Sequence, residues 1–239
     1  VKVTLVIYYK YVPSKNSVKV YISNGYYHIY NRGVDKRKIF QDEQDYSVFL
    51  SYLKNYLTPK KEKELRNKLQ DPSLSPMQRD AVLKELRLNN FYGEVTLLSY
   101  CLMPNHFHLL IKQRSANSLD RFMNSLSTRY VVYFNKKYKR VGPLYQSVYK
   151  AVLVESDSQL LYLTSYIHRN PLSLALQGDP LQTQPSSYRD YLGLRNTDWV
   201  NSKEVLSYFS KTNPSLSYAA FIKQNLPEET IQEVILEKD

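Results

Sequence analysis

The spacing of apolar side chains divides the chain into segments that predict strands and segments that predict helices. Alternating or continuous apolar residues, typical of strands, occupy residues 25–32, 95–103, 106–113 and 150–155. Apolar residues at helical spacing occupy residues 42–57, 118–137 and 158–170. The resulting order of strand, helix, strand, strand, helix, strand and helix predicts an α+β fold. In that fold one antiparallel sheet is covered by helices on one face.

Three further segments lie outside this pattern. Residues 60–90 are highly charged with few apolar anchors, so we expect a helical hairpin inserted into the domain. Residues 1–24 predict a hairpin or an N-terminal extension. Residues 175–239 predict a helical C-terminal appendage, so the main domain should span residues 25–174. The aromatic anchors that we expect for the appendage are Tyr188, Tyr191, Trp199 and Phe209.

The composition narrows the classes of function. The 239 residues include 33 Lys and Arg against 22 Asp and Glu, a formal net charge of +11, which favours a polyanionic partner such as nucleic acid. A single Cys excludes a disulfide framework and a cysteine-cluster zinc site. Six Gly are too few, as they are placed, for a glycine-rich phosphate loop. No apolar run approaches the roughly 18 residues of a membrane span, so we expect a cytoplasmic, nucleoid-associated protein.

Basic charge is concentrated between residues 121 and 154, where there are no acidic residues. The seven cations there are Arg121, Arg129, Lys136, Lys137, Lys139, Arg140 and Lys150. Five tyrosines are interleaved with them. Because cations bind phosphates and aromatic faces stack on unpaired bases, this mixture favours single-stranded nucleic acid over duplex. The alternative is a solvated basic helix face with the tyrosines in the core.

Two of the four histidines lie two residues apart in a predicted strand. His106 and His108 therefore point to the same face, which makes a partial metal site. A zinc site of three histidines would need His28 or His168 beside this pair, and nothing in the sequence places either there. Mg²⁺ or Mn²⁺, completed by a carboxamide and a phosphate, fits better. Such a pair can also arise without function at a surface or in a core.

The predicted helix 158–170 carries Tyr162, Tyr166 and Asn170 at steps of four, so they share one face. His168 lies about 200° around the helix from Tyr166 and is a poor candidate for the same site. A tyrosine hydroxyl next to a metal-bound phosphate can attack the phosphorus atom. In a chain with 23 tyrosines, however, a helical tyrosine is more often a packing residue.

Two motifs resemble a known family. The segment MPNHFHL at residues 103–109 and the segment YIHRNP at residues 166–171 resemble the signatures of single-tyrosine HUH transposases, in particular the REP-associated tyrosine transposases. The NRG segment after Tyr30, with Lys36 and Arg37, and GPLYQSVYK at residues 142–150 are similar to two further family segments. Val148 departs from the pattern, because the family usually has Arg at this position.

The resemblance implies a ferredoxin-like, RRM-like sheet with both histidines on a central strand. It implies that His106, His108 and Asn170 hold Mg²⁺ or Mn²⁺, and that Tyr166 is the nucleophile. The reaction would be nicking and strand transfer of single-stranded DNA at hairpin-forming palindromes, through a covalent 5′-phosphotyrosine intermediate. No nucleotide cofactor would be needed. We expect a monomer, with a homodimer as the alternative.

The basic residues near these motifs complete the expected DNA-binding set. Its members are Arg32, Lys36, Arg37, Arg121, Arg129, Lys136, Lys137, Lys139, Arg140 and Lys150. Two alternative functions share much of this pattern. One is a non-catalytic nucleic-acid-binding relative with the same fold. The other is a metal-dependent nuclease that uses water, with Tyr166 in a structural role.

Overall fold

The structure is a computed structural model that describes residues 21–174 and 179–224. Most of the predicted N-terminal hairpin, residues 1–20, lies outside the described residues. The strands are β1 (Tyr26–Arg32), β2 (Val95–Met103), β3 (His106–Gln113) and β4 (Lys150–Val154). The longer helices are α1 (Glu43–Leu57), α2 (Glu62–Leu69), α3 (Pro76–Arg87), α4 (Ser118–Lys137) and α5 (Asp157–Arg169). The short helices are η1 (Val34–Lys36), η2 (Asn170–Ser173), α6 (Pro180–Thr183), α7 (Tyr188–Tyr191), α8 (Lys203–Leu206), η3 (Pro214–Leu216) and α9 (Tyr218–Ile222).

The four strands form one sheet in the order β2-β3-β1-β4, and every neighbouring pair is antiparallel. With α1 between β1 and β2 and α4 between β3 and β4, this is the β-α-β-β-α-β arrangement of a ferredoxin-like fold. The predicted α+β fold with an antiparallel sheet is confirmed. Both histidines of the pair lie on β3, an inner strand.

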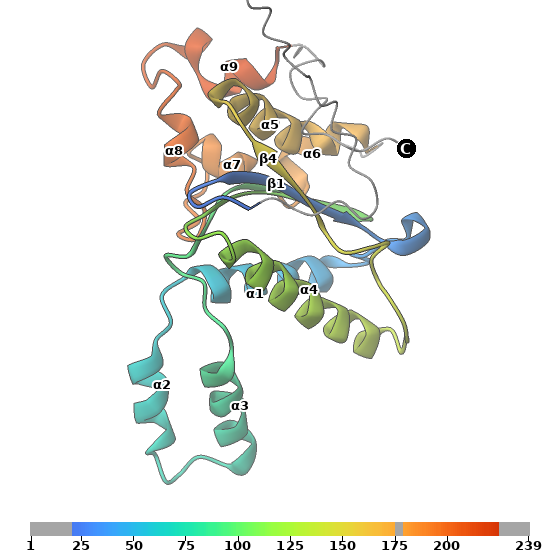
Figure 1. Cartoon of the computed structure of the whole chain (residues 1–239), viewed down its shortest axis with the longest axis vertical. Coiled ribbons are helices and arrows are strands. Elements are labelled where there is room, and N and C mark those ends of the chain that lie inside the picture. The colour runs from blue at the N-terminus through green and yellow to red at the C-terminus, as the bar shows by residue number, and fades with distance from the viewer. Residues whose placement is uncertain (1–20, 175–178, 225–239) are drawn as a thin grey trace, which may run out of the picture.

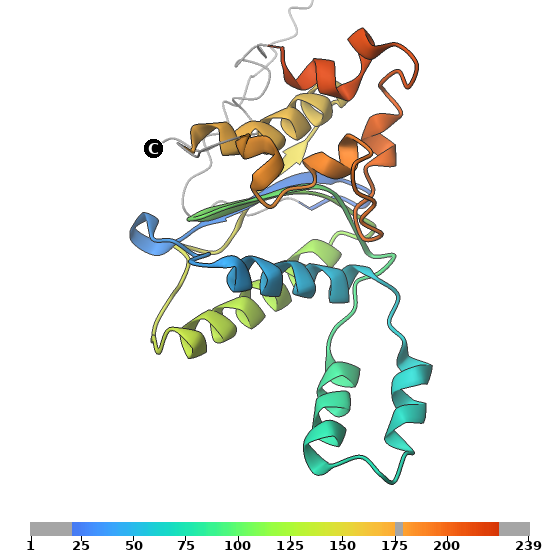
Figure 2. The ribbon, with the colours of Figure 1, turned by 180° about the vertical axis from the view of Figure 1, so that it is seen from behind.

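Helices cover both faces of the sheet (Figures 1 and 2). On one face α1 and α4 pack over a core that includes Ile29, Phe107 and Leu109. On the other face α5 packs with the short C-terminal helices over a second core that includes Leu110 and Ile167. The prediction that the helices of the domain all cover one face is therefore wrong, because apolar spacing shows which side of a helix is buried but not which face of the sheet it packs on. The described part of the C-terminal appendage, residues 179–224, is thus packed onto the domain beside α5.

Local caps set the ends of the helices that matter for the site. The Asp42 side chain accepts a hydrogen bond from the Asp45 N–H and so caps the start of α1. The Ser156 side chain does the same for α5 by accepting from the Gln159 N–H. At its other end α5 stops before Pro171, so Asn170 lies where α5 passes into η2. This position brings the Asn170 side chain next to His106, the first residue of β3.

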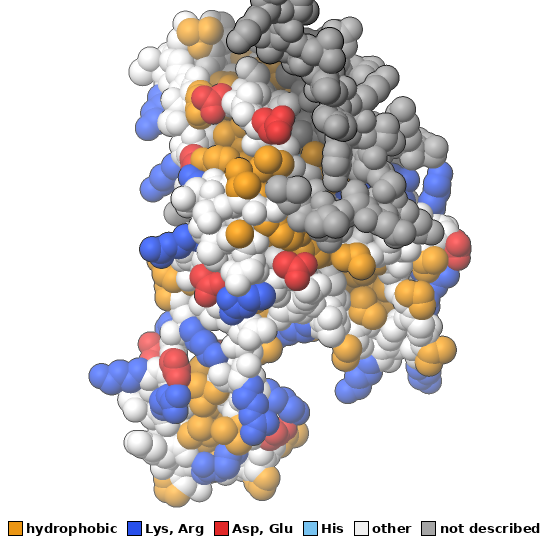
Figure 3. Space-filling view, in the orientation of Figure 1, with side chains coloured by type: hydrophobic (Ala, Val, Ile, Leu, Met, Phe, Trp, Pro, Cys, Tyr) orange, Lys and Arg blue, Asp and Glu red, His pale blue; other side chains and the backbone are white. Residues whose placement is uncertain are grey.

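The predicted insert is a helical hairpin, α2 and α3, which projects away from both layers (Figure 1). Of the residues in these two helices only Val82 is buried. Lys and Arg side chains lie among Asp and Glu side chains on its surface (Figure 3), including the Arg66–Glu62 and Lys84–Asp80 ion pairs. A solvated, self-paired surface explains why this arm can stand outside the core.

Candidate active site

Four ring side chains meet between the sheet and α5. His28 and Tyr30 come from β1, and His106 and His108 come from β3; all four point to the α5 face because side chains of one strand alternate between the two faces. Phe107, between the two histidines, points to the opposite core. The expectation that the two imidazoles share a face is met.

His106 faces the end of α5. Its Nε2 lies 3.1 Å from Oδ1 of Asn170, and its Nδ1 lies 2.6 Å from Oδ1 of the adjacent Asn105. The His106 side chain is 8% exposed, whereas His108 is fully buried. The pair therefore lies at the rim of the core, with His106 slightly exposed and His108 enclosed.

Tyr166 is the tyrosine that α5 places beside this pair. Its ring meets His108 edge to face, with the centroids 5.5 Å apart, and is half-buried. Tyr162, one turn earlier, packs instead against Phe221 of α9, with ring centroids 5.6 Å apart. The two tyrosines share a helix face in the sequence but have different surroundings in the fold.

His28 is the site residue that sequence reasoning missed. Its Nε2 lies 2.9 Å from Nδ1 of His108 inside the core. The sequence gave no reason to place either His28 or His168 beside the His106–His108 pair. For His28 that expectation is wrong, because the structure sets it against His108. The cause is the pairing of β1 with β3, which sets His28 opposite Leu110 and diagonal to His108. The period of two within β1 could have placed His28 on one face, but not next to a particular residue of β3.

His168, by contrast, is apart from the site, as expected. It is buried, with Nδ1 2.6 Å from the Tyr218 hydroxyl and Nε2 2.7 Å from the Ser187 hydroxyl. Burial and then the nearby Arg195 charge lower the pKa of His168 to about 3, so its ring is neutral. It serves to tie α5 to the C-terminal appendage.

The donor atoms suit a small divalent cation. Mg²⁺ binds octahedrally at about 2.1 Å, so two neighbouring ligands stand about 3.0 Å apart. The 3.1 Å between His106 Nε2 and Asn170 Oδ1 agrees with that spacing. Burial, followed by the proximity of His106, His28 and Arg32, lowers the pKa of His108 well below its usual value and keeps the ring neutral. Within residues 21–174 and 179–224 no three His, Cys, Asp or Glu side chains form a metal-binding group, so the amide of Asn170 would be needed.

A basic loop lies against the turn that precedes His106. The Gly33 N–H donates to the Asn105 carbonyl at 2.8 Å, and a Cβ at Gly33 would stand 2.3 Å from the Arg37 carbonyl oxygen, so only glycine fits there. This contact holds exposed Lys36 beside the site. The Asn105 amide reaches the Lys36 carbonyl at 3.4 Å.

The predicted DNA-binding residues fall into two groups. The first group flanks the histidines, and its members are Arg32, Lys36, Arg37 and Lys150. The second group lies on α4 and the turn after it, across the sheet from α5 (Figure 2). Its members are Arg121, Arg129, Lys136, Lys137, Lys139 and Arg140. From the sequence we expected the basic residues between 121 and 150 to form one surface. In the fold Lys150 lies near the histidines, whereas the others lie on and after α4.

Several members of the second group have structural partners. Arg121 forms an ion pair with Glu94 at 3.1 Å, and the Arg129 guanidinium lies 3.8 Å from the centroid of the Tyr52 ring. The tyrosines between these cations are also engaged in the fold, because Tyr130, Tyr145 and Tyr149 are buried and cannot stack on bases. The alternative of tyrosines in the core describes this segment better than a stacking surface.

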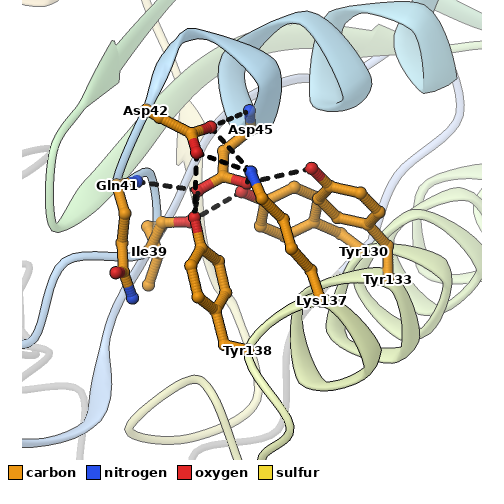
Figure 4. A network of polar contacts seen from close by, with 8 residues as sticks. All are labelled: Ile39, Gln41, Asp42, Asp45, Tyr130, Tyr133, Lys137 and Tyr138. Carbon is orange, nitrogen blue, oxygen red and sulfur yellow. Dashed lines mark hydrogen bonds and ion pairs between the residues drawn. The ribbon is translucent and has the colours of Figure 1, made fainter.

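Lys137 belongs to a closed polar network between α1 and α4 (Figure 4). Its ammonium lies 2.7 Å from both Asp42 and the fully buried Asp45. Burial opposes the charge on Lys137, but its hydrogen bonds to Asp42 and Asp45 raise the pKa of the ammonium. The hydroxyls of Tyr133 and Tyr138 also donate to Asp45, at 3.0 and 2.8 Å. We therefore remove Lys137 from the DNA-contact group.

Comparison with known proteins agrees with the motifs. Residues 81–170, which include both histidines, Tyr166 and Asn170, match the family model described as "Transposase IS200 like". This confirms the family resemblance for that part of the chain. A solved structure described as a REP-associated tyrosine transposase bound to a REP hairpin is similar with a TM-score of 0.49 and 10% identity, covering 90% of this chain and all of that one. No curated protein matches. In the described part of the chain no helix has the length and apolar character of a membrane span.

Proposed function

We propose that this chain, whose residues 81–170 match the IS200-like transposases, is a DNA transposase that nicks and rejoins single-stranded, hairpin-forming DNA. The observation that carries the proposal is the meeting of Tyr166 on α5 and Asn170 at its C-terminal end with His106 and His108 on β3. The proposed nucleophile, two imidazoles and an amide come from segments far apart in the chain and lie close together at the rim of the core.

His106, His108 and Asn170 would hold a divalent cation, which when bound supplies positive charge to a scissile phosphate. The Tyr166 hydroxyl oxygen attacks the phosphorus, and its proton leaves to solvent. The bond between phosphorus and the 3′ oxygen breaks, and that oxygen takes up a proton as a free 3′-OH. The DNA is left joined to the chain as a 5′-phosphotyrosine. Attack by a 3′-OH on this link reverses the step and completes strand transfer without a nucleotide cofactor.

The loop that carries Lys36, together with Arg32 and Lys150, would bind the strand next to the scissile phosphate. Lys36 and Lys150 are exposed, and their cations suit contacts with a phosphate backbone. We expect single-stranded or hairpin DNA to bind more tightly than blunt duplex. The expected DNA partner, the monomeric state and the cytoplasmic location remain predictions.

The deciding experiment is a denaturing gel of the protein with end-labelled hairpin DNA and Mn²⁺. A band of labelled DNA joined to protein is expected. Tyr166→Phe should abolish this band while leaving the fold intact, since only a hydroxyl is lost. Tyr162→Phe is the matched control and should keep most of the adduct, because this ring packs against Phe221.

The two alternative functions predict different products on this gel. Cleavage without any joined species, unchanged in Tyr166→Phe, would identify a nuclease that uses water. Binding without cleavage by the wild-type protein would identify a non-catalytic relative. An adduct that persists in Tyr166→Phe and maps to another tyrosine would refute the assignment of the nucleophile.

A further inference from the structure

His28 and His108 form a buried imidazole pair that the proposed chemistry does not by itself require. The two rings are nearly parallel, at 17°, with Nε2 of His28 2.9 Å from Nδ1 of His108. At this distance one nitrogen carries the hydrogen and the other accepts it. Both side chains are fully buried, and the neighbouring Tyr30 stacks on His28 with ring centroids 4.9 Å apart.

The direction of this hydrogen bond decides what His108 can offer a cation. A neutral imidazole carries one proton, on either Nδ1 or Nε2. If His108 donates from Nδ1, its Nε2 has a lone pair directed away from His28. If His28 donates instead, the lone pair of His108 at Nδ1 is already used and its Nε2 carries a proton. Only the first arrangement makes His108 a metal ligand through Nε2.

We propose that His28 is a positioning residue for the metal site: its Nε2 accepts the Nδ1–H of His108 and so holds the Nε2 lone pair of His108 ready for the cation. The inference rests on the proposed function only in taking His108 as a ligand. Metal-binding histidines usually donate their other ring N–H to a neighbouring acceptor, and that acceptor is most often a carboxylate or a carbonyl. Here a second imidazole, from the adjacent strand, takes this place.

The orientation of the His28 ring is itself fixed by packing. Tyr30 stacks on it from the same strand, and Tyr166 of α5 meets it edge to face with centroids 6.1 Å apart. Since Tyr166 also contacts His108, the proposed nucleophile closes the layer over both imidazoles. His28 therefore links the proposed ligand to the strand β1 and to the helix that carries Tyr166.

The test measures Mn²⁺ affinity of the full chain by electron paramagnetic resonance, without DNA. His28→Phe keeps an aromatic ring but cannot accept a hydrogen bond, and should weaken Mn²⁺ binding about 10- to 100-fold. His28→Gln can place an amide oxygen near the position of Nε2 and should restore most of the affinity. Gln113→Leu is the matched control. It removes a buried amide on β3 that donates to the Ile22 carbonyl and accepts from the Leu119 N–H, and it should leave Mn²⁺ affinity unchanged.

A second measurement needs no variant at His28. Nitrogen-15 NMR of the metal-free wild type should show the His108 proton on Nδ1, and a proton on Nε2 would overturn the proposal. Equal Mn²⁺ affinity of His28→Phe and wild type would overturn it too. Failure of the proposed function looks different: Mn²⁺ binding would then be unaffected by His106→Ala and His108→Ala, whatever residue 28 is.

Discussion

Nε2 of His106 and Oδ1 of Asn170 lie 3.1 Å apart, although 64 residues separate them in the chain. His106 is the first residue of β3, and Asn170 directly follows the last residue of α5. The contact therefore joins the sheet to the helix that carries Tyr166. The distance is that of a hydrogen bond, and it would also suit two neighbouring ligands of an octahedral cation. The position of the proposed nucleophile is thereby coupled to the proposed metal site.

The first prediction concerns this contact. Asn170→Ala and His106→Ala should each lower Mn²⁺ affinity by about tenfold or more, because each removes a proposed ligand, and should stop cleavage while hairpin DNA still binds. EDTA should stop cleavage by the wild type. Calorimetry with Mn²⁺ and a cleavage gel check this. Asn124→Ala removes an exposed amide on α4 that bonds Asp120 and serves as the control. Full cleavage in EDTA would show that the site needs no metal.

The second prediction separates the two basic groups. If Lys36 and Lys150 contact phosphates, Lys36→Gln and Lys150→Gln should each weaken hairpin binding and reduce the log–log salt slope by about 0.7. Lys136→Gln removes one exposed positive charge from α4, on the other side of the sheet, and should change neither quantity. Fluorescence anisotropy at several salt concentrations measures both. The reverse result would place the DNA on the α4 surface.

The third prediction concerns stability. Asp45→Asn removes a fully buried carboxylate that accepts from Lys137 and two tyrosine hydroxyls, while Lys137 keeps its pair with Asp42, and should lower the free energy of unfolding by about 1–3 kcal/mol. Lys84→Ala breaks the exposed Lys84–Asp80 pair and should cost only about 0.3–0.5 kcal/mol. Urea unfolding followed by circular dichroism compares them. Losses of similar size in the two variants would contradict the importance of burial here.

The fourth prediction concerns alkaline pH. Burial is the main reason that the pKa of Tyr100 rises to about 12 in the folded chain. The pKa of a tyrosine in an unfolded chain is about 10. Between these values the unfolded state has lost a proton that the folded state keeps, so stability should fall as pH rises. Urea midpoints at increasing pH should show a shallower fall in Tyr100→Phe. Tyr92→Phe, at a side chain that is 59% exposed, should follow the wild type.

Much of the fold can be predicted from the sequence because it depends on local periodicity. Alternation within one strand is enough to put His106 and His108 on one face, and steps of four are enough to align Tyr166 with Asn170. The Asp42 cap and Pro171 set helix ends through short-range contacts. The charged insert follows from the same kind of pattern. These features need no knowledge of which strand lies beside which.

Tertiary structure decided the contacts that cross between elements. Pairing of β1 with β3 set His28 against His108, and the register of two strands about 80 residues apart is not visible in either strand alone. Packing of α1 on α4 enclosed Asp45 with Lys137 and removed a lysine from the expected DNA surface. Local spacing shows which residues share a face, whereas only the packing of distant segments determines which face meets which partner, because that depends on the burial free energy of the whole chain.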